Sequence, residues 1–164
     1  MKEKKPNLRE VAPSESIAHA LWEAHICIGV WAFCACLAML RKAIDLWSAW
    51  YRDQHGMTFD RIAGEKDNIY WRLQKIATEN KLYRDSIHTI IDGLRLDAND
   101  AVHAVVICAG GQPGDYDGAA IVAIREPFEC LHSLVVKLIS TTMPGTNILY
   151  SDRSRWRDKP PGTS

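Results

Sequence analysis

Apolar residues recur along most of the chain at intervals of three and four, which is the spacing of one face of an α-helix. No segment of useful length alternates polar and apolar residues, and residues 102–109 (VHAVVICA) form the only strand-like run. The pattern therefore predicts an all-α fold, an antiparallel bundle of about five helices.

The N-terminal half predicts a short helix and a long one. A helical stripe begins at Ile17, and we expect Gly29 to divide it. Residues 26–40 are apolar on all sides, which predicts a core helix in the middle of the bundle. This run is shorter than the roughly 20 residues that a membrane-spanning helix needs, and charged residues follow it directly, so we expect no membrane contact.

Polar residues, glycine and proline predict where the other helices begin and end. The expected boundaries are His55-Gly56 and Asn80 as C-terminal ends, and Asp85 or Ser86 and Asp117 as N-terminal starts. Pro127 lies inside the last stripe and predicts a kink or a helix start there. We expect residues 1–13 to be a flexible arm, residues 14–140 the bundle domain, and residues 141–164 a flexible basic tail.

Charge and cysteine content narrow the classes of function. The 20 basic and 20 acidic side chains cancel, so any contact with nucleic acid must come from a local patch, a dimer groove or a small site. The five cysteines are odd in number and contain no CxxC pair, which predicts buried free thiols in a reducing, cytoplasmic compartment. Neither the cysteines nor the histidines have metal-ligand spacing, so we expect no metal and no cofactor.

The strongest candidate for chemistry is a polar stripe of Arg95, Asn99 and His103, spaced four residues apart, with Asp100 beside it. In a continuous helix these side chains share one face, because each step turns only about 40° past a full turn. Arginine can hold a phosphate, histidine can move a proton near neutral pH, and asparagine can orient either group. Such a set can cleave RNA without a metal ion, since the 2′-hydroxyl of RNA is the nucleophile.

A structural interpretation stands beside this one. Polar residues at a helix junction often satisfy one another or a loop backbone, and spacing alone favours that interpretation. Arg41 and Asp45 are four residues apart on the long helix and can form a simple ion pair. Alternatively, the two can face the stripe that begins at Arg95.

Two segments resemble an uncharacterised prokaryotic helical family of the HEPN superfamily. LRLDANDAVH (94–103) resembles its Arg-x-x-Gly-Asn-x-x-x-His signature, and ACLAMLRKAIDL (35–46) resembles its long helix. The likeness spans roughly residues 15–140. The resemblance implies a HEPN-like bundle that pairs as a homodimer, with the arginine and the histidine facing a shared cleft.

The resemblance also implies a function. Many HEPN domains are metal-independent endoribonucleases of antiviral defence or toxin–antitoxin systems, where a partner protein can act as inhibitor. By matching position, Arg95 contacts RNA phosphate, His103 is the acid or base, and Asn99 positions them, with Asp100 and Arg41 as further binding residues. The alternative is a non-catalytic module that binds a partner protein or a nucleotide, and the seven residues between Arg95 and His103 favour it.

Overall fold

The computed structural model describes residues 13–95 and 118–143, and within these two ranges it contains five helices and no strand. The helices are α1 (Pro13–Gly29), α2 (Phe33–His55), α3 (Ile69–Glu79), α4 (Arg84–Leu94) and α6 (Gly118–Thr142). The prediction of an all-α bundle is confirmed. Residues 1–12 of the expected arm, the strand-like run, Asp117 and residues 144–164 of the expected tail lie outside the described residues. Pro13 belongs to α1, and Thr141 and Thr142 belong to α6, so the bundle extends slightly beyond the predicted bounds of 14–140.

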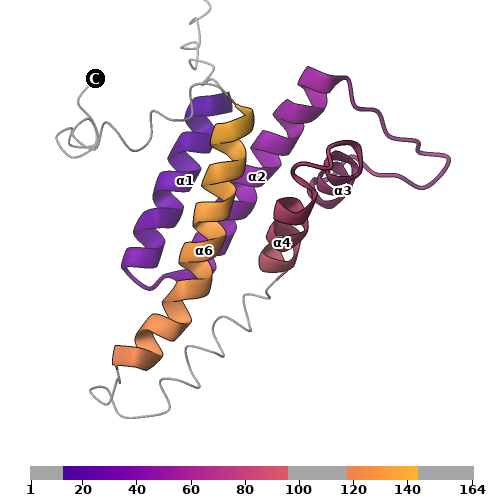
Figure 1. Cartoon of the computed structure of the whole chain (residues 1–164). Coiled ribbons are helices and arrows are strands. Elements are labelled where there is room, and N and C mark those ends of the chain that lie inside the picture. Colours follow the sequence, from indigo (N-terminus) through magenta and orange to yellow (C-terminus); the bar gives the residue numbers. More distant parts are fainter. Residues whose placement is uncertain (1–12, 96–117, 144–164) are drawn as a thin grey trace, which may run out of the picture.

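Helix α2 is the centre of the bundle, because it packs against each of the other four helices. Figure 1 shows α1 running antiparallel to both α2 and α6, and these three long helices pack together. The shorter helices α3 and α4 lie on the side of α2 that faces away from α1 (Figure 1). Helix α4 also contacts α6, so the two groups of helices share one core.

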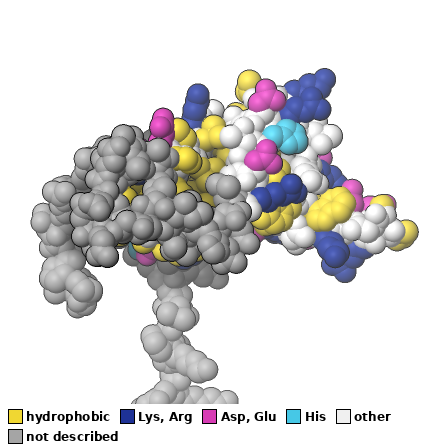
Figure 2. All heavy atoms as spheres, turned by 90° about the horizontal axis from the view of Figure 1, so that it is seen from below, with side chains coloured by type: hydrophobic (Ala, Val, Ile, Leu, Met, Phe, Trp, Pro, Cys, Tyr) yellow, Lys and Arg dark blue, Asp and Glu magenta, His cyan; other side chains and the backbone are white. Residues whose placement is uncertain are grey.

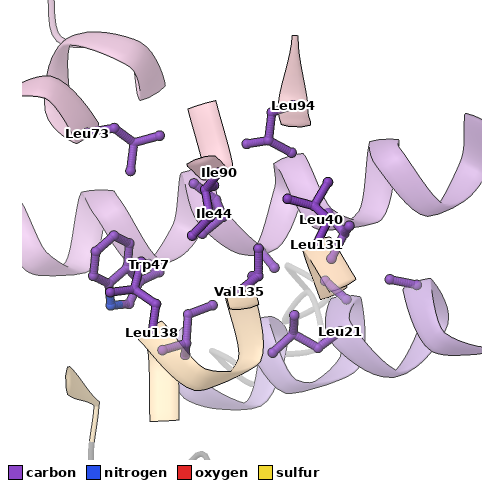
Figure 3. Packing of buried hydrophobic residues seen from close by; sticks show 14 of the residues in the cluster. Leu21, Leu40, Ile44, Trp47, Leu73, Ile90, Leu94, Leu131, Val135 and Leu138 are labelled. Atoms are coloured by element: carbon purple, nitrogen blue, oxygen red, sulfur yellow. The ribbon is translucent and has the colours of Figure 1, made fainter. Parts of the chain in front are cut away.

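The core is formed where the apolar stripes of all five helices meet around α2. Its labelled members in Figure 3 are Leu21 from α1, Leu40, Ile44 and Trp47 from α2, Leu73 from α3, Ile90 and Leu94 from α4, and Leu131, Val135 and Leu138 from α6. Trp47 has no exposed surface, and its Nε1 donates a hydrogen bond to Thr142 Oγ1 at 2.8 Å. The helical spacing thus identified the buried faces correctly.

The junction of α1 and α2 confirms the predicted division at Gly29 and corrects the prediction of one core helix over residues 26–40. Residues 26–40 are not a single core helix, because α1 ends at Gly29 and the chain turns before α2 begins at Phe33. Ala32 N–H donates to Cys27 O at 2.8 Å and Trp31 N–H donates to Ile28 O at 3.2 Å, which is the Schellman pattern of a helix end. Trp31 is the left-handed residue of this turn, with φ 66°. An apolar run thus contains a helix end made by backbone hydrogen bonds.

Other helix ends agree with the predictions in part. Helix α2 ends at His55 with Gly56 in the left-handed conformation, and Asn80 closes α3, both as predicted. Helix α4 begins at Arg84, before the predicted Asp85 or Ser86, and Tyr83 provides no side-chain cap. Helix α6 continues from Gly118 through Pro127, so the alternative of a start near this proline is wrong.

No helix within residues 13–95 and 118–143 combines the length and the apolar character required to cross a membrane.

Candidate functional site

The first member of the predicted stripe lies at the C-terminal end of α4. Arg95 is exposed, and its backbone N–H donates to Ile91 O at 3.1 Å and to Asp92 O at 3.2 Å. These bonds make Arg95 the C-terminal cap of the helix. Asn99, Asp100 and His103 lie outside the described residues, so the structure places only the arginine of the stripe.

Arg41 from the central helix reaches the same end of α4. Its Nε donates to Leu94 O at 3.0 Å, and its Nη2 donates to the same oxygen. The last carbonyls of a helix lack intrahelical partners and carry partial negative charge, so an arginine there is stabilising. Fifty-three residues of sequence separate the two partners, and the contact brings Arg41 next to the residue that precedes Arg95.

The expected ion pair between Arg41 and Asp45 is not formed. Asp45 instead accepts a hydrogen bond from Nη2 of Arg72, on α3. The spacing of four residues permitted a pair between Arg41 and Asp45, but the side chain of Arg41 points towards α4. The simple-ion-pair interpretation is therefore wrong.

Tyr70 connects Arg95 to the start of α3. The guanidinium carbon of Arg95 lies 5.7 Å from the centroid of the Tyr70 ring, within the range of a cation–π contact. Tyr70 itself is half-buried and packs against the hydrophobic core. Helices α2, α3 and α4 thus converge on one corner of the molecule, and each supplies a side chain to it.

A groove of about 740 Å³ adjoins this corner, and we call it the α2–α3 groove. Its lining residues are Arg41, Lys42, Asp45, Asp67, Asn68, Ile69, Tyr70 and Arg72. Lys42, Tyr70 and Arg72 were not among the candidates predicted from the sequence. The adjacency of Lys42 to Arg41 was a usable signal, but nothing in the spacing of Tyr70 relates it to Arg95.

Arg72 is the fixed centre of a polar network along the groove. It is 6% exposed, and its Nε donates to Ser48 Oγ at 3.0 Å while its Nη1 donates to Asp67 Oδ1 at 2.9 Å. With the bond to Asp45, every nitrogen of the guanidinium has an acceptor. A buried charge needs this kind of compensation, because leaving it unpaired costs several kcal/mol, on the order of 3–5. The network therefore holds α3 on α2 in one register.

The same network decides the charge of the groove. Asp45 and Asp67 both pair with Arg72, and Asp67 also accepts a hydrogen bond from Arg52. In contrast, no carboxylate of residues 13–95 or 118–143 pairs with Arg41, Lys42 or Arg95. The convergence of the three helices is thus locally positive although the chain as a whole is neutral.

The basic side chains without a described carboxylate partner at this corner are few, namely Arg41, Lys42 and Arg95. Figure 2 shows Lys and Arg side chains interspersed with acidic and hydrophobic ones on the described part of the face it presents. The face shows no continuous basic patch of the kind that holds nucleic acid by bulk electrostatics. Any anion bound at the corner must therefore be recognised by a few specific groups.

The other titratable candidates are structural. His132 is buried, and its Nε2 lies 3.0 Å from Leu21 O, so the neutral ring carries its proton on Nε2. Burial lowers the pKa of His132 from its ordinary value, which suits a core histidine that joins α6 to α1. Within residues 13–95 and 118–143, no group of three His, Cys, Asp or Glu side chains is arranged to hold a metal ion.

The cysteines only partly agree with the expectation of buried thiols. Cys36 is fully buried, and burial raises the pKa of its thiol to about 12, which keeps it unreactive. Cys130 is exposed on α6, however, and corrects the prediction. Its position follows from the helical period, because Cys130 falls between the buried residues Phe128 and Leu131.

Comparison with known proteins finds no matching family model, no matching curated protein and no matching solved structure.

Proposed function

We propose that this chain is a HEPN-like domain that acts on RNA as a metal-independent endoribonuclease, in antiviral defence or a toxin–antitoxin system. The observation that carries the proposal is the convergence of Arg41 and Arg95 at the C-terminal end of α4. Two guanidinium groups without carboxylate partners among the described residues suit a phosphate, since arginine matches its geometry with a planar fork of donors.

The proposed reaction divides the work between these groups and the rest of the stripe. Arg95 holds the scissile phosphate and stabilises the charge that builds on it. His103 moves the proton of the 2′-hydroxyl or of the leaving oxygen, and Asn99 positions its neighbours. As the resemblance implies, two copies pair so that these residues face a shared cleft, in the cytoplasm and under the control of a partner protein.

A second candidate function is a non-catalytic module that binds a partner protein or a nucleotide. The specific observation in its favour is that the fold already uses both arginines. Arg41 caps α4 through Leu94 O, and Arg95 lies over the ring of Tyr70. These structural contacts account for both arginines without any catalytic role.

Cleavage of single-stranded RNA in the presence of EDTA separates the two candidates. We expect purified protein to cut the RNA, His103→Ala to abolish cutting, and Arg95→Ala to reduce it by at least about tenfold, as for loss of a charge-stabilising group. Arg61→Ala, on the connector between α2 and α3, is the matched control and retains activity. Full activity in His103→Ala, with the helical content unchanged, would refute the assignment.

The non-catalytic candidate makes the opposite prediction. It requires intact RNA at every pH from about 6 to 9, the range in which a histidine titrates. It also requires a constant companion protein that binds the purified chain directly.

A further inference from the structure

We propose that the α2–α3 groove binds an unpaired nucleotide of single-stranded RNA, with the base stacked on Tyr70 and the phosphate beside Arg41 and Lys42. The inference rests on the proposed function, because it names the substrate class of the same site. It adds a binding subsite made only of described residues, next to Arg95.

Tyr70 has the properties of a stacking platform. It lines the groove, and its packing against the core restrains the ring before any ligand arrives. The guanidinium of Arg95 lies 5.7 Å from the ring centroid, so a base that stacks on Tyr70 displaces this flat cationic group from the ring. Proteins bind single strands by stacking bases on such rings, and every base has a π-face, so stacking tolerates any sequence.

The phosphate contacts come from the α2 side of the groove. Arg41 uses Nε and Nη2 to hold Leu94 O, and this fixes the plane of its guanidinium. Its Nη1 has no hydrogen-bond partner among residues 13–95 and 118–143, so that edge of the guanidinium can donate to a phosphate oxygen. Lys42 lines the same groove and adds a second positive charge.

The carboxylates of the groove do not cancel this charge. Asp45 and Asp67 both accept hydrogen bonds from the buried Arg72, which offsets part of their negative charge. One guanidinium balances only one of the two carboxylates, but the three basic residues that line the groove outnumber the two acidic ones, so the groove keeps a net positive charge. A bound nucleotide therefore has a preferred direction, with its phosphate towards α2.

Size and shape select the form of the RNA. A volume of about 740 Å³ lies within the 300–1,000 Å³ that is usual for sites holding one small ligand. A paired base inside an A-form helix cannot reach a ring in a groove, because its faces are already stacked. The volume is therefore large enough for one splayed nucleotide, and we expect a duplex to bind more weakly.

The test measures binding apart from cleavage. Fluorescence anisotropy of labelled octauridylate is recorded with the full chain carrying His103→Ala, so that the RNA stays intact. In this background, Tyr70→Phe keeps the ring and Tyr70→Leu keeps most of the volume without it. We expect Tyr70→Phe to retain the affinity and Tyr70→Leu to weaken it on the order of tenfold, because the leucine variant loses the stacking of one base.

Two further binding measurements test the charge of the groove and its preference for single-stranded RNA. Lys42→Ala should lower the salt dependence of binding by about 0.7 in the log–log slope, as for one phosphate contact on a single strand. Arg61→Ala, a basic side chain outside the groove, is the control that leaves the affinity unchanged. A self-complementary RNA duplex of equal length should bind at least about tenfold more weakly than the single strand.

The outcomes separate this inference from the proposed nuclease. Equal affinities for the Phe and Leu variants, or equal binding of duplex and single strand, would overturn the groove even if the wild-type protein cleaves RNA. Binding that depends on the Tyr70 ring supports the groove even if the wild-type protein cleaves nothing, in which case the nuclease proposal fails alone.

Discussion

The two groups of helices that flank α2 are attached to it by different kinds of interaction. Against α1 and α6, α2 buries apolar side chains such as Leu40 and Trp47, and the contacts are nearly all hydrophobic. Against α3 and α4, it adds charged groups, with Arg72 bonded to Asp45 and Arg41 bonded to Leu94 O. Apolar burial is non-directional, whereas these hydrogen bonds require specific atoms at specific places.

This difference explains why the candidate site lies where it does. The interfaces of α2 with α1 and α6 contain few polar groups. The polar side brings cations from separate helices to one corner and holds them in defined orientations. The predictions below test this division, beginning with the largest expected effect.

Trp47→Ala should cause the largest loss of stability. The side chain is fully buried at the meeting point of α2 and α6, and removing it leaves a cavity and takes away the donor to Thr142 Oγ1, whose hydroxyl still donates to Leu138 O. We expect the free energy of unfolding to fall by about 3–5 kcal/mol in urea titrations. Trp50→Ala, at a half-buried position on the same helix, is the control. An equal loss of stability in this variant would show that burial at the contact with α6 is not the cause.

Arg72→Met should lower the free energy of unfolding less than Trp47→Ala does. The carboxylate partners of Arg72 are partly exposed, so water can replace the contacts that they lose. We expect a loss of about 1–3 kcal/mol, mainly from leaving the buried Ser48 hydroxyl without its donor. The matched control is Arg52→Ala, a more exposed member of the same network, where we expect less than about 1 kcal/mol. If Arg72→Met were as stable as wild type in the same urea titration, the polar network would orient α3 without stabilising it.

His132 is a polar exception on the apolar side and should make stability depend on pH. Burial lowers the pKa of the folded state below its ordinary value of 6.5, so the unfolded chain binds the proton more readily. The contribution is complete above pH 6.5 and is lost as the pH falls towards the folded value, by up to about 1.4 kcal/mol per pH unit.

His132→Gln tests this dependence with a side chain that can still donate to Leu21 O. Its unfolding free energy should change less between pH 7.5 and 5.5 than that of the wild-type protein, when both are measured by urea titration. Parallel pH profiles for the two proteins would show that other groups control acid stability.

The smallest effect is expected at the turn between α1 and α2. Trp31 has φ 66°, a conformation that disfavours side chains with a Cβ. Comparing Trp31→Gly with Trp31→Ala removes the ring from both variants and leaves the backbone preference as the difference. The glycine variant should be more stable by about 1 kcal/mol in thermal or urea unfolding. Equal stabilities would mean that the turn relaxes without the ring.

Helical spacing predicted the fold class and most buried faces, because burial against a neighbour imposes the 3.6-residue period on any bundle helix. Gly29 marked the end of the first helix correctly. The apolar run at residues 26–40 was nevertheless misleading, since apolar content alone does not show where the backbone leaves the helix. The turn at Trp31 depends on hydrogen bonds from Trp31 and Ala32 to earlier carbonyls, and any residue supplies these groups.

The candidate site was predictable only to a smaller extent. The sequence identified Arg95 and Arg41 as candidates through spacing and resemblance. Of the two interpretations of Arg41, the ion pair with Asp45 was wrong, whereas the alternative that Arg41 faces the start of the stripe agrees with its bond to Leu94 O. It contained no signal that Tyr70 lies beside Arg95, because contacts between helices far apart in sequence leave no periodic pattern. Asn99, Asp100 and His103 remain predictions from the stripe itself.

The sequence alone therefore determined that this chain forms a helical bundle, because the period of its apolar residues is a local property of each segment. Only the tertiary structure decided which cations meet at the end of α4, and that Arg72 rather than Arg41 pairs with Asp45. The physical reason is that a long charged side chain can reach several possible partners, both on its own helix and on neighbouring helices. The packing of the apolar faces determines which partners on the neighbouring helices come within hydrogen-bond distance.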